Sequence, residues 1–81
     1  MLTIDIFVPI IEKNYDFSVD ENIKIETITE DIIDLIFQKE GYSSHDVFDM
    51  CLFSQDKEQI LTPDLTLWEC GIDNGDRLLL V

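Results

Sequence analysis

One amphipathic segment near the middle of the chain constrains the fold most. Residues 27–30 read Thr-Ile-Thr-Glu, the form of a capping box in which the Thr27 hydroxyl and the Glu30 carboxylate accept main-chain N–H groups at a helix start. Lys39 suits the negative end of the helix dipole, and Gly41 supplies a left-handed stop. An apolar stripe lies between them at helical spacing, made of Ile28, Ile32, Ile33, Leu35, Ile36 and Phe37. We therefore expect one helix that begins at Thr27 and buries this stripe.

Short stretches with period-two alternation precede and follow this helix. The first two are separated by only a short polar connection, so we expect them to form a hairpin. The last two are separated by an irregular connection with several apolar residues. The expected strands are residues 2–8, 15–19, 50–53, 60–61 and 77–81. The second strand either ends at Val19 or continues through Ile23 and Ile25, which keep the same alternation. One helix among strands in this order predicts an α+β fold with the helix packed across one face of a sheet.

Length and charge narrow the classes of function. The 81 residues suffice for one small domain, residues 1–81, and this length disfavours most enzymes. The chain has 18 Asp and Glu against 5 Lys and Arg, which gives a net charge of −13. Because the five cations are scattered singly, we expect binding neither to nucleic acid nor to an anionic membrane surface. The acidic excess solubilises the domain, or alternatively steers a basic partner toward it.

The first residues of the chain and its two cysteines indicate the cellular compartment. The first residues lack the basic start and long apolar stretch of a signal peptide, and no apolar run is long enough to span a membrane. We therefore expect a cytoplasmic protein without membrane insertion. Cys51 and Cys70 fit that compartment as reduced, buried and unreactive thiols, and a single disulfide is the alternative.

A turn-strand motif near the end of the chain is more specific. Residues 67–78 match the pattern Leu-x-[Asp/Glu]-x-Gly-Ile-x-[Asn/Asp]-Gly-Asp-x-Leu. Leu67 and Ile72 are spaced to fill the underside of a core, and Gly71 and Gly75 permit backbone angles that a β-carbon disfavours. Together with the order of elements, this motif resembles the ubiquitin-like β-grasp superfamily. That resemblance implies a mixed sheet of four to five strands with one main helix across one face.

Within that superfamily the chain most resembles the YukD and EsaB group of type VII secretion in Gram-positive bacteria. The likeness covers the apolar helix and four short segments, and it is loose over residues 42–66. The segments are Ile-Asp-Ile at 4–6, Tyr-Asp-Phe-Ser-Val at 15–19, Cys-Gly-Ile at 70–72 and Asn-Gly-Asp-Arg-Leu at 74–78. The resemblance implies an accessory or regulatory protein that acts by contact in the cytoplasm, with a secretion-system component as partner. It brings no catalytic residues.

The chain departs from ubiquitin itself at its end. Conjugation requires a flexible tail ending in Gly-Gly, and sulfur carriers also use a terminal glycine, whereas the last residue here is Val81. We therefore expect a non-conjugating domain.

Few residues suggest catalysis or metal binding. His45 is the one histidine, and we expect it to be a solvated loop residue. Its spacing from Cys51 and Cys70 matches no zinc pattern. The turn at 73–76 contains part of a calcium-loop pattern but lacks the spaced Glu that completes the ligand set. We expect no catalytic residue, metal or cofactor, and therefore not an enzyme.

The candidate protein-binding site is apolar. If Cys51 and Phe53 face the core, alternation turns four apolar side chains onto the open face of the sheet: Met50, Leu52, Leu79 and Val81. Outward apolar residues are common on strands, but four together on an acidic chain favour a binding patch. The expected function is a protein-binding module, and a homo-oligomer that uses the same face is the alternative. We also expect Trp68 to pack partly against the sheet edge.

Overall fold

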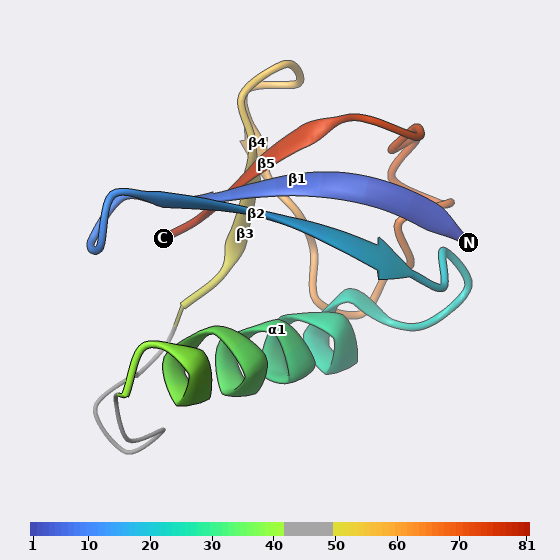
Figure 1. The fold of residues 1–81 in the computed structure, drawn as a ribbon. Helices are drawn as coiled ribbons and strands as arrows, with labels where there is room; N and C mark the ends of the chain where they lie inside the picture. The colour runs from blue at the N-terminus through green and yellow to red at the C-terminus, as the bar shows by residue number, and fades with distance from the viewer. Residues whose placement is uncertain (42–49) are drawn as a thin grey trace.

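The computed structural model describes residues 1–41 and 50–81 as a five-stranded mixed sheet with one helix across one face (Figure 1). The strands lie in the order β2-β1-β5-β3-β4; β1 and β5 pair in parallel and the other neighbours are antiparallel. The elements are β1 (Leu2–Val8), β2 (Lys13–Val19), α1 (Ile25–Lys39), β3 (Leu52–Ser54), β4 (Gln59–Ile60) and β5 (Arg77–Leu80). The α+β arrangement expected from the sequence is confirmed. Among the described residues, no helix is long and apolar enough to cross a membrane.

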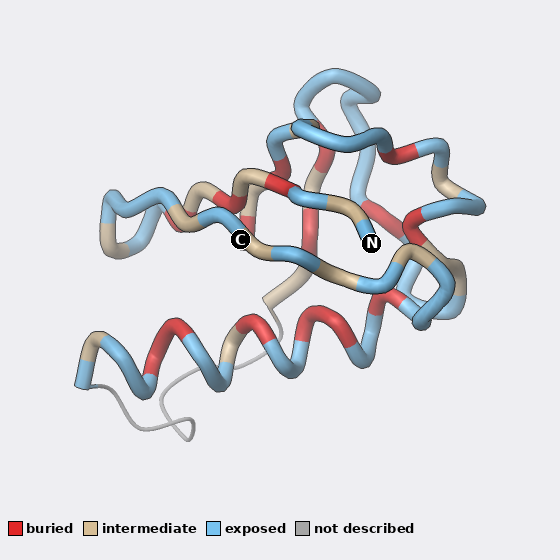
Figure 2. The backbone as a smooth tube through the Cα atoms, turned by 45° about the vertical axis from the view of Figure 1, so that its right-hand side comes forward, coloured by how far each residue is buried: buried red, intermediate tan, exposed pale blue. Residues whose placement is uncertain are grey.

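The core lies between the sheet and the inner face of α1. Figure 2 shows the buried positions of the helix recurring on the side that faces the strands. Most of the predicted apolar stripe is buried there, but Leu35 is 57% exposed and Ile33 is only partly buried. The core consists of Ile4, Ile6, Val8, Ile25, Ile28, Ile32, Ile36, Phe37, Leu52, Leu61, Leu67, Ile72, Leu78 and Leu80.

The helix begins earlier than the capping-box motif predicts. No side chain caps its start, so the expectation that Thr27 caps the helix is wrong. The main-chain N–H of Ile25 instead donates to the Leu65 carbonyl oxygen at 2.8 Å, and that of Glu26 donates to the Pro63 carbonyl oxygen at 3.0 Å. The N–H groups at a helix start need partners outside the helix. Here a segment distant in sequence provides them.

Residues 61–67, called the strap below, connect the helix start to the sheet. The Leu61 N–H donates to the Leu52 carbonyl oxygen at 2.9 Å, which joins the strap to β3. Thr66 forms an isolated antiparallel bridge with Lys24, immediately before α1. Leu67 then enters the core with no exposed surface. The strap therefore fixes the position of the helix start relative to β3.

The turn-strand motif of residues 67–78 adopts the conformation its residues predict. Gly71 and Gly75 have φ angles of +72° and +87°, in the left-handed region that glycine tolerates best. The Asp73 N–H donates to the Asp76 carboxylate at 2.8 Å, so the aspartate closes its own turn. Leu67, Ile72 and Leu78 of the motif are buried in the core.

A polar group joins β2 to the end of α1. The Tyr15 hydroxyl donates to Glu40 Oε1, and Lys13 Nζ donates to Glu40 Oε2 at 2.6 Å. Lys39 Nζ lies 5.6 Å from the centre of the Tyr15 ring. Burial, reinforced by the Glu40 carboxylate, raises the pKa of Tyr15 to about 12. Hydrogen bonds from Lys13 and Tyr15 lower the pKa of Glu40.

A substitution at Thr27 tests whether the main chain of the strap, and not the Thr27 side chain, caps the start of α1. Thr27→Ala should leave the free energy of unfolding unchanged or raise it by a few tenths of a kcal/mol, because Ala is the better residue inside a helix. Loss of a true side-chain cap would instead cost about 1 kcal/mol. Ile25→Ala is the matched comparison, and it should cost about 2–4 kcal/mol because Ile25 is buried. Urea denaturation measures the free energy of unfolding of both variants. A loss near 1 kcal/mol for Thr27→Ala would indicate that the capping box forms.

The Tyr15 group predicts a pH dependence. Because the pKa of Tyr15 is raised above its ordinary value of 10.0, its contribution to stability is complete below pH 10 and is lost as the pH rises through about 12. The contribution of Glu40, whose pKa is lowered, is present above its ordinary pKa and is lost as the pH falls. Glu40→Gln should lower the pKa of Tyr15 part of the way toward 10. Carbon-13 NMR titration of the Tyr15 ring measures this, and an unchanged pKa would contradict the pairing.

Candidate functional site

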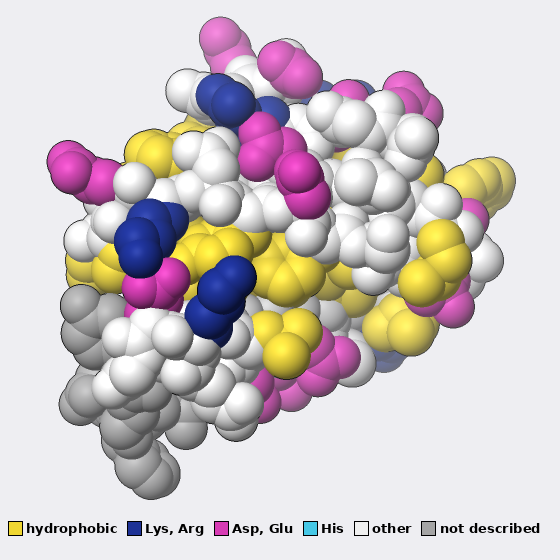
Figure 3. Space-filling model, in the orientation of Figure 1, with side chains coloured by type: hydrophobic (Ala, Val, Ile, Leu, Met, Phe, Trp, Pro, Cys, Tyr) yellow, Lys and Arg dark blue, Asp and Glu magenta, His cyan; other side chains and the backbone are white. Residues whose placement is uncertain are grey.

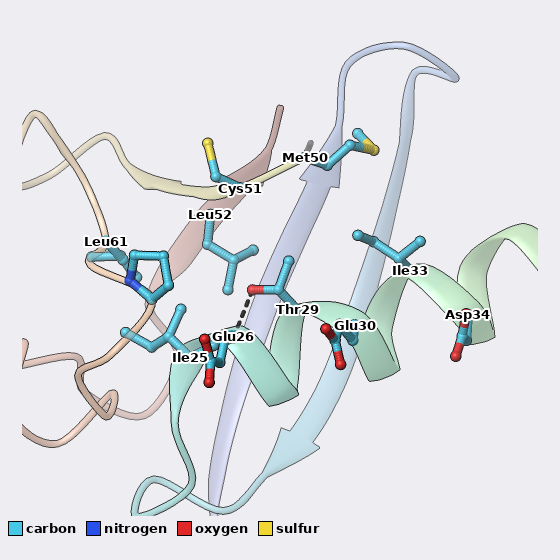
Figure 4. A pocket seen from close by; sticks show the side chains of 11 residues that line it. Ile25, Glu26, Thr29, Glu30, Ile33, Asp34, Met50, Cys51, Leu52 and Leu61 are labelled. Atoms are coloured by element: carbon cyan, nitrogen blue, oxygen red, sulfur yellow. Dashed lines mark hydrogen bonds between the residues drawn. The ribbon is translucent and has the colours of Figure 1, made fainter. Parts of the chain in front are cut away.

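The structure reverses the expected orientation of Leu52, one of the four residues of the candidate site. Leu52 lies directly opposite Leu80 on the neighbouring antiparallel strand, and both are fully buried. Residues directly opposite each other project from the same face of a sheet, so Leu52 must face the helix with Leu80. Figure 4 shows Leu52 directed toward α1 and Cys51 directed away from it. The expectation that Leu52 faces outward is therefore wrong.

The other three candidate residues divide between the two sides of the sheet. Met50 is partly buried and lines a groove beside α1, so it does not belong to the open face either. Leu79 is partly buried and alternates with the buried Leu78 and Leu80, which places it on the open face as expected. Val81 is 47% exposed. The structure thus separates the four residues that the sequence grouped together.

The open face carries an apolar row that the sequence analysis did not identify. Phe7 is the register partner of Leu79, Leu79 is the partner of Phe53, and Phe53 is the partner of Ile60. These residues, called the open-face row below, cross β1, β5, β3 and β4. Ile60 is 59% exposed and the other three are partly buried. Only the register of four strands, which has no local sequence signal, brings them together.

A polar group borders the open-face row on β1 and β5. Asp5 is the register partner of Arg77, and the Arg77 Nε donates to Asp5 Oδ2 at 2.9 Å. Asn14 donates to Asp5 Oδ1 at 3.2 Å from β2. The hydrogen bonds from Asn14 and then from Arg77 lower the pKa of Asp5. The carboxylate beside the row is thus neutralised by an adjacent cation.

A second apolar surface follows the seam between β2 and α1. Figure 3 shows yellow side chains along this seam, with Lys or Arg side chains over one end. A shallow hollow of about 510 Å³ lies there, lined by Phe17, Leu35, Ile36, Gln38 and Lys39. Ile36 belongs to the core and Phe17 packs against it, whereas Leu35 is exposed.

Cys51 and Cys70 are the described residues that were considered for catalysis or metal binding. Cys51 and Cys70 are both free and partly exposed, so the expectation that both are buried is wrong. Burial nevertheless raises the pKa of the Cys70 thiol. His45 lies outside the described residues. Within residues 1–41 and 50–81, no three His, Cys, Asp or Glu side chains are grouped so that they could hold a metal ion.

Trp68 lies on the surface. Its side chain is 71% exposed, so the expected packing against the sheet edge is wrong. Its main-chain N–H donates to the Glu21 carbonyl oxygen at 3.1 Å, which fixes the backbone although the ring remains in solvent. An exposed Trp is a common interface anchor, so Trp68 is a rival to the open-face row.

Single substitutions test which of Leu52 and Leu79 faces the helix and which lies on the open face. Leu52→Asp should abolish the cooperative thermal transition, because a carboxylate without a partner would be buried beneath the helix. Leu79→Asp should cost about 1 kcal/mol, because the side chain reaches solvent on the open face. Circular-dichroism melts of the two variants measure this difference. If Leu79→Asp were the less stable of the two variants, Leu52 would lie on the open face.

Comparison with known proteins supports the fold. No protein-family model and no curated protein sequence matches the chain. In structure it is similar to the EccD5 ubiquitin-like domain from Mycobacterium xenopi, with a TM-score of 0.79, 19% identity, and coverage of 99% of this chain and 91% of that one. It is also similar to a chain of the MycP5-free ESX-5 inner membrane complex in State II, with a TM-score of 0.78 and 15% identity. That match covers 99% of this chain but only 20% of the other.

A third match is the solution structure of a computationally designed protein based on the template of human erythrocytic ubiquitin. Its TM-score is 0.70 at 28% identity, and the match covers 100% of this chain and 90% of that one. The finer resemblance to the YukD and EsaB group stays a prediction. A five-stranded mixed sheet with one helix across it, shared with these structures, identifies the fold of this chain as the ubiquitin-like β-grasp.

Proposed function

We propose that this chain is a non-enzymatic, ubiquitin-like protein-binding module of a bacterial type VII secretion system. It acts as an accessory or regulatory component in the cytoplasm and binds a partner protein through the open-face row. The observation that carries the proposal is the alignment of Phe7, Leu79, Phe53 and Ile60 across four strands of a strongly acidic chain.

Two likenesses support the cellular context. The sequence resembles the YukD and EsaB group in the apolar helix and in four short segments. The fold is similar to the EccD5 ubiquitin-like domain and to a chain of the ESX-5 inner membrane complex. Both likenesses favour a protein component of such a system as the partner.

The composition of the open-face row suits protein recognition. A few well-packed side chains in the centre of a contact, often aromatic ones, provide most of the binding energy, while a polar rim excludes water. Phe7, Phe53, Leu79 and Ile60 form such a centre, and the Asp5–Arg77 pair forms part of its rim. Because Arg77 neutralises Asp5, a partner does not have to desolvate an isolated charge there.

A different protein is favoured over a second copy as the partner. The chain carries a net charge of −13, so two copies that met face to face would repel each other. The open-face row would have to overcome this repulsion in a homo-oligomer, whereas a neutral or basic partner would not oppose it. Self-association through the same row is the alternative that the experiment separates.

Substitution of residues in the open-face row tests the proposal. Ile60→Asp and Leu79→Asp should each reduce recovery of a secretion-system component from native cell extracts by at least about tenfold, because the new carboxylate would be desolvated in the contact. Tagged chains, chemical cross-linking and mass spectrometry measure the recovery, and a melt confirms that each variant is folded.

Trp68→Ala is the matched surface control. It should leave recovery within about twofold of the unsubstituted chain if the open-face row is the contact. Full recovery with both row variants and loss with Trp68→Ala would move the contact to Trp68. A sizing column at low concentration that showed a dimer, lost in Ile60→Asp, would assign the row to self-association.

A further inference from the structure

A groove of about 480 Å³ lies between residues 25–34 of α1 and the start of β3 (Figure 4). The strap borders it at the end nearest Ile25, where Leu61 and Pro63 belong to the lining. The groove lies on the helix side of the sheet, whereas the open-face row lies on the opposite side. The two surfaces are therefore separate.

The floor of the groove is apolar. Leu52 and Leu61 are buried beneath it, and Ile33 and Met50 are partly exposed within it. Leu61 is joined to Leu52 by a main-chain hydrogen bond of 2.9 Å, so the strap and β3 hold this floor together. Methionine is unbranched and adapts to different apolar surfaces, which suits a docking site. Apolar side chains of a partner would find a preformed surface here.

The rim of the groove on the helix side is acidic. Glu26, Glu30 and Asp34 follow one another at four-residue intervals, and all three are exposed. A four-residue interval corresponds to about 6 Å along a helix axis, so the carboxylates span about 12 Å on one stripe. None of the ion pairs formed by the described residues includes them, and neither Lys nor Arg is among the residues that line the groove.

This arrangement opposes the stability of the isolated helix. Carboxylates four residues apart repel each other on a helix surface, so alternation with Lys would stabilise α1 better. A partner with cations at the same spacing would remove that repulsion and gain attraction. The acidic rim and the apolar floor thus favour the same occupant, a basic segment with an apolar face.

We propose that this groove docks a basic amphipathic helix of a partner protein. Lys or Arg at four-residue intervals on that helix pair with Glu26, Glu30 and Asp34, and an adjacent apolar stripe packs on Ile33 and Met50. This site does not depend on the open-face row, so one domain can hold two partners on opposite sides of its sheet.

Designed peptides test the groove directly. The probe is a helical peptide of Ala, Leu and Lys, with Lys at three positions four residues apart and Leu on the neighbouring stripe. A control peptide of the same composition has its Lys positions distributed around the helix. Titration of the full 81-residue chain, followed by NMR and by fluorescence anisotropy, gives the affected residues and the affinity.

The probe should shift the signals of Ile33, Met50 and Leu52, and should bind at least about tenfold more tightly than the control peptide. Neutralising the rim in the triple variant Glu26→Gln, Glu30→Gln and Asp34→Asn should weaken binding by about tenfold or more. Met50→Gln, which keeps side-chain length, should weaken binding without changing its dependence on salt.

A second triple variant provides the matched control for net charge. Asp16→Asn, Asp56→Asn and Glu58→Gln remove the same charge from exposed positions outside the groove. This control should bind the probe within about twofold of the unsubstituted chain, since distant surface charges are largely screened. Equal weakening in both triples, or signal shifts confined to Phe7, Phe53 and Leu79, would overturn the proposal.

Discussion

The main-chain hydrogen bonds between the strap and the start of α1 are the constraint on which the rest of the structure depends. The carbonyl groups of Pro63 and Leu65 accept the first free N–H groups of the helix, and Leu61 bonds to β3 in the same segment. These bonds connect the helix to the last third of the chain. They set the spacing between α1 and β3, and therefore create the groove with its apolar floor.

Much of the fold follows from local sequence patterns, but the features that depend on distant partners do not. The helix and the glycine turns were predictable because period and turn chemistry are local. The pattern at Thr27 predicts a side-chain cap that does not form, because carbonyl groups of the strap accept the first N–H groups of the helix. Leu52 was placed on the wrong face because a three-residue strand has almost no alternation of its own, and its parity is set by pairing with Leu80.

The candidate site was predictable only in part for the same reason. Leu79 and Val81 face outward as the alternation in the last strand indicates, whereas Phe7 and Ile60 join Leu79 only through strand register. The prediction that Trp68 is packed against the sheet was wrong for a local reason. The size of Trp68 favours burial, but the turn that carries it lies at the surface. A surface assembled from four strands has no contiguous motif in the sequence.

The distribution of the few cations gives the two proposed surfaces different physical character. Lys13 and Arg77 are each paired with a carboxylate, and Lys39 lies over an aromatic ring. The open-face row consequently lies beside a neutralised pair, and its specificity depends on the shape and burial of apolar side chains. The groove keeps its carboxylates unpaired, and their field extends into solvent, where it accelerates the approach of a basic segment. Contact through the row should therefore be nearly independent of salt, while contact through the groove should weaken as salt rises, because screening acts on exposed charge and not on apolar burial.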